Sequence, residues 1–266
     1  MDGEKAIAKG VLPELVKGGV QLISQFYQDL AQPTVKAVGK TLGTTFEFAT
    51  IPALALGVAT EKVKVNFAKR LEEYKKKLDK IPDEDKCAVE PEIGEPIIRN
   101  LMNTTNDQIA DLFTTLLANA SNLKTLDKAH PKFAQIVRNM TPDEARIIRY
   151  LKGKKEICYL EFRGHKENDN SFYDFMSYVT LIPNEVNLTF PQNINAYIAN
   201  LISSGILLDM NGTYITNDAI YKKIEHLHRP ILEKQLIPDV YSRISTEKSY
   251  FQVTDFGKLF INACIA

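Results

Sequence analysis

The chain has 266 residues and equal numbers of basic and acidic side chains, 33 of each, so its formal net charge is +0. This balance excludes the whole-chain basic field that draws many proteins to nucleic acid, and it leaves only a local basic patch open. Three widely separated cysteines, without a CxxC pair, favour buried thiols in a reducing cytoplasm. The first ten residues lack the apolar core of a signal peptide, which favours the same compartment.

Residues 11–30 are the first predicted helix, with one broad apolar stripe and Pro13 in the first turn. Gly18 and Gly19 in its middle weaken the helix by about 1 kcal/mol each relative to alanine. Pro33 opens a second segment. Because such breaks permit bending, we interpret the glycine pair and Pro33 as candidate hinges.

The most apolar stretch of the chain is LGTTFEFATIPALALGVAT, residues 42–60. As one helix it would be about 28 Å long, barely the thickness of a bilayer core. Glu47 would cost about 2.5–3.5 kcal/mol at the membrane centre, which argues against a permanent span. The stretch predicts a buried helix or helical hairpin, or alternatively a surface that inserts into lipid or docks a partner. The candidate membrane or partner face consists of Leu42, Phe46, Phe48, Ile51, Leu54 and Leu56.

The next stretch, EKVKVNFAKRLEEYKKKLDKIPDEDK, predicts a helix that Pro82 ends. Its apolar residues follow 4-3-4-3 spacing, so one seam faces a partner helix while Lys and Glu cover the rest. This seam pairs either within the chain or between chains, which leaves a homo-oligomer open. Its members are Phe67, Leu71, Tyr74, Leu78 and Ile81. The following CAVEPEIGEP predicts an extended connector.

Further amphipathic helices are predicted from residue 97 to Leu151, since apolar residues recur there at intervals of three and four. Their N-caps can be read from the sequence: Thr105 or Asn106, His130 and Thr141. Glu144 is placed to close a capping box with Thr141.

After residue 156 the pattern changes from helical to mixed. EICYLEF and YFQV predict strands, and ILLDMNGTYI predicts a hairpin with Asn211-Gly212 at its turn. INAYIANLISSG predicts a helix that Gly205 stops, and DAIYKKIEHLHRPILEKQL predicts another. VTDFGKLFINACI predicts a final helix behind Thr254.

These elements predict a mainly α protein with two domains. The first, residues 1–151, is helical and carries the apolar N-terminal segment. The second, residues 152–266, is a small α+β winged-helix-like domain with one inserted helix.

Chemical motifs are missing from the sequence. It contains no G-x-x-x-x-G-K, G-x-G-x-x-G or G-x-S-x-G motif. His226 and His228 are two residues apart and therefore lie on different faces of a helix, which does not suit a metal pair. We therefore predict no enzyme, no catalytic residue, no cofactor, no metal and no small-molecule substrate.

The helix that a winged-helix protein would place in DNA, residues 191–205, contains no Lys, Arg or His. Readers of DNA need cations for phosphates as well as polar groups for base edges, so specific DNA binding is not expected. A basic cluster on the following helix supplies the candidate nucleic-acid contacts of the alternative interpretation. These are Lys222, Lys223, His226 and Arg229.

Several stretches, in their order and spacing, resemble the Abi-alpha family, the abortive-infection alpha proteins of bacteria. They are KTLGTTFEFATIPALAL, EKVKVNFAKRLEEYKKKLDKIP, IADLFTTLLANASN, AHPKFAQIVRNMTPDEARIIRYL and VTDFGKLFINACI. The most specific are the His130-Pro131 helix with its Thr141 cap, and the closing Thr254-x-x-Gly257 helix. The resemblance implies a cytoplasmic bacterial protein of antiphage defence that kills or arrests the infected cell. It supplies no catalytic residues.

Two hypotheses follow. In the first, the chain is a non-enzymatic defence effector whose apolar N-terminal helices are released upon infection and act on a membrane or a partner protein. It would then be cytoplasmic and become membrane-associated when activated. In the second, it is a winged-helix regulator or nucleic-acid sensor. A toxin enzyme with a dispersed active site also stays open.

Overall fold

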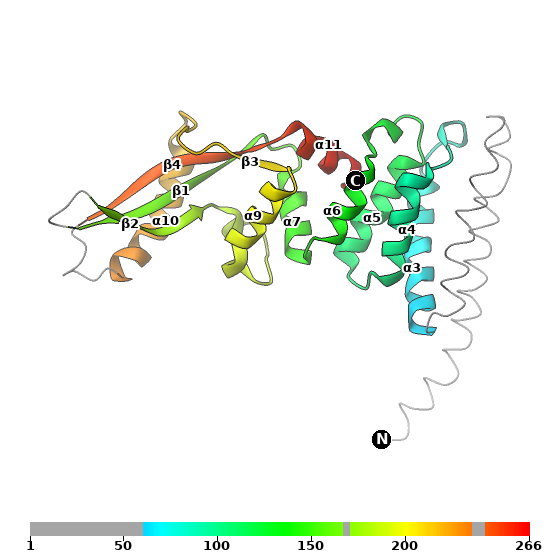
Figure 1. The fold of residues 1–266 in the computed structure, drawn as a ribbon, viewed down its shortest axis with the longest axis horizontal. Helices are drawn as coiled ribbons and strands as arrows, with labels where there is room; N and C mark the ends of the chain where they lie inside the picture. Colours follow the sequence, from blue (N-terminus) through cyan, green and yellow to red (C-terminus); the bar gives the residue numbers. More distant parts are fainter. Residues whose placement is uncertain (1–60, 167–170, 236–242) are drawn as a thin grey trace, which may run out of the picture. The chain divides into compact units, whose positions relative to one another are not determined.

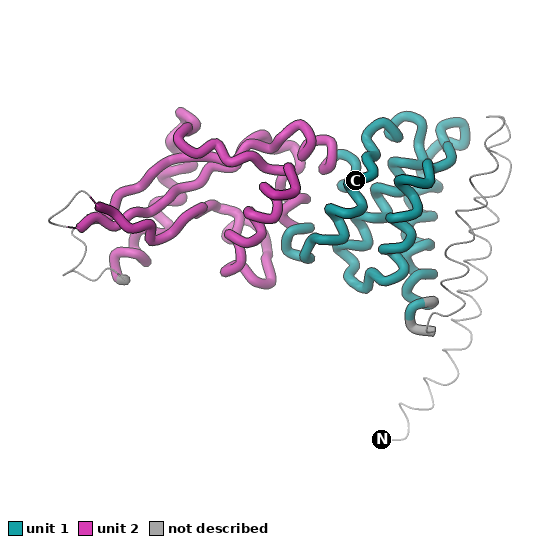
Figure 2. Tube along the Cα trace, in the orientation of Figure 1, with its two compact units in different colours: residues 1–145, 262–266 teal, residues 146–261 magenta. Residues whose placement is uncertain are grey.

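The computed structural model describes residues 61–166, 171–235 and 243–266. The predictions for residues 1–60, including the hinges and the candidate membrane or partner face, lie outside the described residues. The described chain forms two compact units, which Figure 2 colours separately. Unit 1 contains the described residues up to Ala145 together with Asn262–Ala266, and unit 2 contains Arg146–Ile261.

Unit 1 is built from helices, as its periodicity predicts (Figure 1). They are α3 (Glu61–Leu78), α4 (Pro91–Asn103), α5 (Asp107–Ala120) and α6 (Pro131–Arg138), with the short turns η2 (Asp83–Asp85) and η3 (Leu126–Lys128). The boundary between the units falls within α7 (Pro142–Leu151) and within α11 (Asp255–Cys264).

The first half of the apolar seam of α3 packs inside unit 1. This half of the seam therefore pairs within the chain. Phe67, Leu71 and Tyr74 are at most 1% exposed, and α3 packs against α4 and α5. The Tyr74 hydroxyl lies 2.7 Å from Ser121 Oγ at the end of α5, and burial raises the pKa of Tyr74 to about 12.

Two cations of α3 add a polar clamp to this apolar contact. Arg70, only 1% exposed, donates to the Thr105 carbonyl at 2.9 Å and pairs with Asp107 at 2.7 Å. Lys77 Nζ donates to Asp111 Oδ1 at 2.6 Å and to the Thr114 hydroxyl at 2.9 Å. Because the buried Arg70 and the partly buried Lys77 each have carboxylate and neutral acceptors, α3 is fixed in register against the start of α5.

The helix N-termini follow the sequence closely. Asn106 Oδ1 accepts from two backbone amides of α5, and His130 Nδ1 accepts from the Lys132 amide at 3.1 Å. The capping box is present, with Thr141 N donating to Glu144 Oε2 at 2.6 Å and Glu144 N donating to Thr141 Oγ1 at 3.2 Å.

The extended connector predicted for residues 87–96 is confirmed only for residues 87–90, which lie outside any helix, and it is wrong for residues 91–96, because α4 already begins at Pro91. Pro91 is the first helical residue, where the missing amide proton costs nothing. Pro96 lies inside the same helix, one turn later. Because proline has no amide proton, Pro96 cannot donate to the Glu92 carbonyl, and the helix lacks that one hydrogen bond. The helix nevertheless accommodates both prolines, although prolines usually mark an irregular segment.

Unit 2 contains a four-stranded antiparallel sheet in the order β2-β1-β4-β3. Its strands are β1 (Glu156–His165), β2 (Phe172–Val179), β3 (Leu207–Asp209) and β4 (Arg243–Val253). The helices α8 (Ile182–Glu185), α9 (Ile194–Ser203) and α10 (Ala219–Gln235), and the turn η4 (Pro191–Asn193), complete the unit.

The two strands predicted from EICYLEF and YFQV are confirmed as parts of β1 and β4, whereas the hairpin around Asn211-Gly212 is wrong. Only its first arm is a strand, β3, and that strand pairs with β4. The turn chemistry is present, with Gly212 at a φ of +82°, but the chain continues into α10 and returns later as β4. The sequence also gave no indication of β2.

Helix α10 covers one face of the sheet, and its inner side joins the core of unit 2 (Figure 1). Tyr221, Ile224 and Leu232 recur at helical spacing and are buried at 5% exposure or less. They form one cluster with alternate residues of β1, since residues two apart on a strand share a face. The β1 members are Cys158, Leu160 and Phe162.

The Thr254-x-x-Gly257 pattern has a structural explanation at the start of α11. Thr254 Oγ1 accepts from the Gly257 amide at 2.8 Å and donates to the Gly205 carbonyl at 2.6 Å. Gly205 itself ends α9 with a φ of +79°, a conformation that glycine adopts without strain. A Cβ on Gly257 would lie 2.3 Å from the Ile206 carbonyl oxygen, so this first turn requires glycine.

We therefore predict that Gly257→Ala destabilises the protein. Alanine is the better helix former by about 1 kcal/mol, but the overlap with the Ile206 backbone should outweigh this and leave a net loss of about 1–3 kcal/mol. Denaturant unfolding measures the difference. The control Lys258→Ala, one residue further and exposed, should stay within about 0.5 kcal/mol of the wild type. A Gly257→Ala protein as stable as the wild type would contradict the close approach of α11 to residue 206.

Candidate functional site on helix α10

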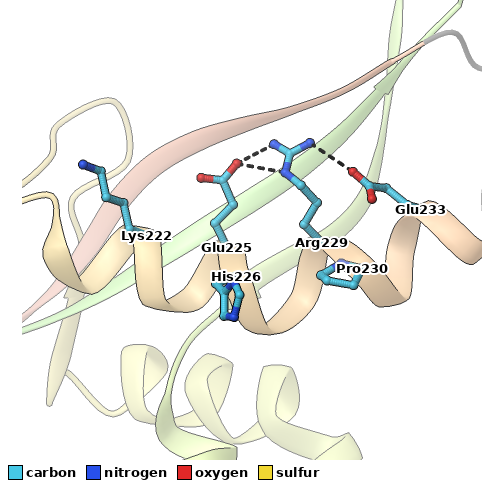
Figure 3. Close-up of a pocket in the computed structure, with 6 residues that line it drawn as sticks. All are labelled: Lys222, Glu225, His226, Arg229, Pro230 and Glu233. Atoms are coloured by element: carbon cyan, nitrogen blue, oxygen red, sulfur yellow. Dashed lines mark hydrogen bonds and ion pairs between the residues drawn. The ribbon is translucent and has the colours of Figure 1, made fainter.

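Three of the four candidate nucleic-acid residues lie along one side of α10, where they line a shallow depression of about 290 Å³ (Figure 3). Their positions three, four and seven residues apart bring them onto one side of the helix. The lining residues are Lys222, Glu225, His226, Arg229, Pro230 and Glu233.

The guanidinium of Arg229 is paired within the helix. Its Nε donates to Glu225 Oε1 at 3.0 Å, Nη2 contacts the same carboxylate, and Nη1 lies 3.8 Å from Glu233 Oε1 (Figure 3). With Lys222, this side of α10 therefore holds two cations and two carboxylates. A phosphate would have to compete with both carboxylates for Arg229.

Lys223 is not part of this group. Its Nζ donates to Glu185 Oε1 at 3.0 Å, and the Tyr150 hydroxyl donates to Glu185 Oε2 at 2.7 Å. The hydrogen bond from Tyr150, followed by that from Lys223, lowers the pKa of the Glu185 carboxyl. Burial, together with that carboxylate, raises the pKa of Tyr150. The structure thus uses Lys223 to join α10 to α8.

His228 faces the interior side of α10. Its Nε2 atom is buried and has no hydrogen-bond partner among the residues that the structure describes. Burial lowers the pKa of the imidazole, because the charged form loses hydration. The folded protein therefore favours the neutral form of the His228 ring.

A polar cluster on the opposite face of the sheet was missed in the sequence. The Tyr159 and Tyr178 hydroxyls donate to the two oxygens of Asp209 at 2.7 and 3.1 Å. Tyr178 adopts a φ of 57°, uncommon for a residue with a side chain, and both tyrosine rings contact Phe251. Three aromatic rings and one carboxylate thus fix the end of β3. No local pattern of the sequence indicates this cluster, because its hydrogen-bonding members come from three strands, β1, β2 and β3.

Beside this cluster, Arg163 forms ion pairs with three carboxylates. It contacts Glu161 at 3.3 Å, Asp174 at 3.0 Å and Glu247 at 3.1 Å, on three neighbouring strand segments. Burial, with the Asp174 charge second, raises the pKa of Glu161. The guanidinium also lies over the Phe172 ring.

Within the described ranges, no group of three or more His, Cys, Asp or Glu is arranged to hold a metal ion. No helix there is both long enough and apolar enough to cross a membrane. The fold is that of a mainly α protein with one small antiparallel sheet.

The family model for abortive infection alpha matches residues 63–264, so the chain belongs to the Abi-alpha family. This confirms the resemblance seen in the sequence, although the stretch before residue 63 lies outside the match. No curated protein matches the chain. The chain is also similar to a solved structure, that of the uncharacterized protein from the hydrocarbon-degrading marine bacterium Alcanivorax borkumensis SK2. That similarity has a TM-score of 0.32 at 13% identity, over 50% of this chain and 92% of that one.

The geometry of His228 predicts a pH-dependent stability. Because its pKa is lowered in the folded state, the unfolded chain takes up a proton first as the pH falls below about 6.5. The free energy of unfolding should therefore fall between pH 7 and pH 5. We expect His228→Leu to reduce this fall, as followed by urea unfolding at several pH values.

The matched control for this measurement is His226→Leu, which changes the exposed histidine on the same helix and should keep the wild-type pH profile. If His228→Leu and wild type lose stability in parallel between pH 7 and pH 5, His228 is not the group responsible.

Proposed function

We propose that the chain is a cytoplasmic antiphage-defence effector that acts through contact with a membrane or a partner protein, without catalysis. Membership of the abortive infection alpha family supports the defence role. The mode of action rests on one observation, the stretch of 19 residues from Leu42 to Thr60 with Glu47 as its single charge. Activation would release this stretch, with Gly18-Gly19 and Pro33 as hinges.

The anchoring of α3 supports such a release. Residue 60 leads directly into α3, whose cations Arg70 and Lys77 are held by α5 and the preceding loop. Arg70 is buried, so opening this contact would leave its charge without acceptors and would destabilise the folded protein. A segment that moves needs a fixed attachment, and α3 supplies one because it follows residue 60 directly in the chain.

The double substitution Phe48→Ser with Leu54→Ser tests the effector proposal. Two large apolar side chains removed from an inserting face forfeit roughly 3–5 kcal/mol, which lowers the bound population about a hundredfold or more. We expect the variant to lose phage protection, measured by plating efficiency, while circular dichroism and the melting temperature remain those of the wild type. Dye entry into infected cells separates membrane damage from inhibition of a partner.

The matched control is Leu123→Ser with Phe190→Ser, which changes the same residue types at positions 50% and 53% exposed. It should protect fully. Full protection by a normally folded Phe48→Ser, Leu54→Ser protein would remove this stretch from the mechanism. A lowered melting temperature in that protein would instead assign the stretch to the core, because burial loss costs a comparable amount of stability.

The alternative function is a winged-helix regulator or nucleic-acid sensor. The order α7, β1, α9, β3, β4 and α11 supports it, since a winged helix also joins helices to a small antiparallel sheet, here with β2 and α10 added. Charge pairing weighs against it, because Arg229 and Lys223 already meet carboxylates. Asn195, a potential base reader, donates its amide to the Ser177 carbonyl at 3.2 Å.

Salt dependence separates the alternative from the effector proposal. Binding through phosphates weakens steeply with salt, by a factor of about 10³ or more between 50 and 200 mM for six contacts. We expect no such binding to duplex DNA or RNA, and no change in Lys222→Ala with Lys223→Ala. Tight binding at low salt that this double variant abolishes would establish the regulator instead.

A further inference from the structure

His228 occupies a position of α10 where the helical period places core residues. The residues of this helix that belong to the core of unit 2 are Tyr221, Ile224 and Leu232. His228 lies four residues after Ile224 and four before Leu232, so it continues their spacing along the inner side of the helix. The period favours an apolar side chain at this position, and the sequence has a titratable ring instead.

One nitrogen of this ring is buried without a partner. Nε2 of His228 has no hydrogen-bond partner among the residues that the structure describes. Most buried polar atoms of folded proteins are hydrogen-bonded, because an unsatisfied one loses its hydration without compensation. A leucine would fill the same position without this cost. Packing alone therefore does not explain why a histidine stands here.

In the described part of unit 2, the carboxylates around α10 are already paired with cations. The pairs are Glu225 and Glu233 with Arg229, Asp218 with Lys248, and Glu185 with Lys223. Strand β1 turns apolar residues and the Cys158 thiol toward the helix, and burial raises the pKa of that thiol. On the same face, β4 contributes Lys248 and Tyr250, opposite Leu160 and Cys158. A protonated His228 ring would therefore face cations and neutral groups.

The backbone of α10 is interrupted close to His228. Pro230 lies inside the helix and has no amide proton, so the His226 carbonyl lacks the hydrogen bond that residue 230 would otherwise donate (Figure 3). Beyond His228, α10 joins the core cluster through Leu232, whereas Ile231, Glu233 and Lys234 are exposed. The C-terminal part of the helix is therefore attached to the core mainly through His228 and Leu232.

We propose that residues 228–235 of α10 form a proton-operated switch, which detaches from the core of unit 2 when the His228 ring is protonated. The sheet and the first part of the helix stay folded. Tyr221 holds that first part, since its hydroxyl donates to the Ser249 carbonyl at 3.0 Å and accepts from the Ile215 amide at 3.1 Å. Such a local opening is distinct from global unfolding, because it needs only the last turns of one helix to separate.

The direction of the pH dependence follows from the burial of the ring. In the open state the ring is hydrated and takes up a proton near its ordinary pKa of about 6.5, whereas burial holds the pKa of His228 lower in the closed state. The open state therefore binds the proton more tightly, and its population rises as the pH falls below about 6.5. At pH 5.5 this single proton can shift the equilibrium at most about tenfold, since each pH unit contributes one decade.

Hydrogen exchange of the full-length protein at pH 7 and pH 5.5 tests the proposal. After correction for the intrinsic effect of pH, the protection of amides in residues 228–235 should fall about three- to tenfold at the lower pH. Amides of β1 that are bonded to β4 should change by less than about twofold. His228→Leu should keep residues 228–235 protected at both pH values. The matched control His226→Leu changes the exposed histidine of the same helix and should behave as the wild type.

A second variant, His228→Lys, places a lasting charge at the same position. It should show the low protection of residues 228–235 already at pH 7, with β1 still protected. Equal protection of residues 228–235 at both pH values in the wild type would overturn the proposal. So would a loss that β1 and β4 share equally, or one that His228→Leu retains. The inference does not depend on the proposed function, because it concerns unit 2 alone.

Discussion

Ten residues of β1 pair one for one with β4, from Glu156 opposite Gln252 to His165 opposite Arg243. The rest of unit 2 depends on this register. Because neighbouring residues of a strand point to opposite faces, it sends one set of side chains toward α10 and presents Tyr159 to Asp209 on the other face. A slip by one residue would exchange the two sets, bury charges such as that of Glu161 under α10 and expose the core.

Features of the fold that depend on a few consecutive residues could be predicted from the sequence, and those that depend on distant ones could not. The capping box at Thr141 needs only the residues of one helical turn, so it is visible in the sequence. Strand β2 has large side chains on both faces and therefore no alternation, as an edge strand need bury neither face fully. Its existence depends on β1, and the partner of β3 is β4, more than thirty residues away.

The same distinction applies to the candidate site. The pairs of Arg229 with Glu225 and Glu233 lie four residues apart on one helix and can be anticipated from sequence. The pairing of Lys223 with Glu185 spans 38 residues and could not be. A basic cluster in sequence is therefore an upper limit on the charge that a surface offers, since the fold decides how much is already paired. Here the fold pairs Lys223 and Arg229 with carboxylates, whereas phosphate binding would need unpaired cations.

The family match begins at residue 63, immediately after the apolar stretch of residues 42–60. The matched part includes α3, with the hydrogen bonds and ion pairs of Arg70 and Lys77, and the whole sheet of unit 2. The apolar stretch lies outside it. The defence role and the mode of action therefore rest on different parts of the chain, the first on the matched residues and the second on residues 42–60.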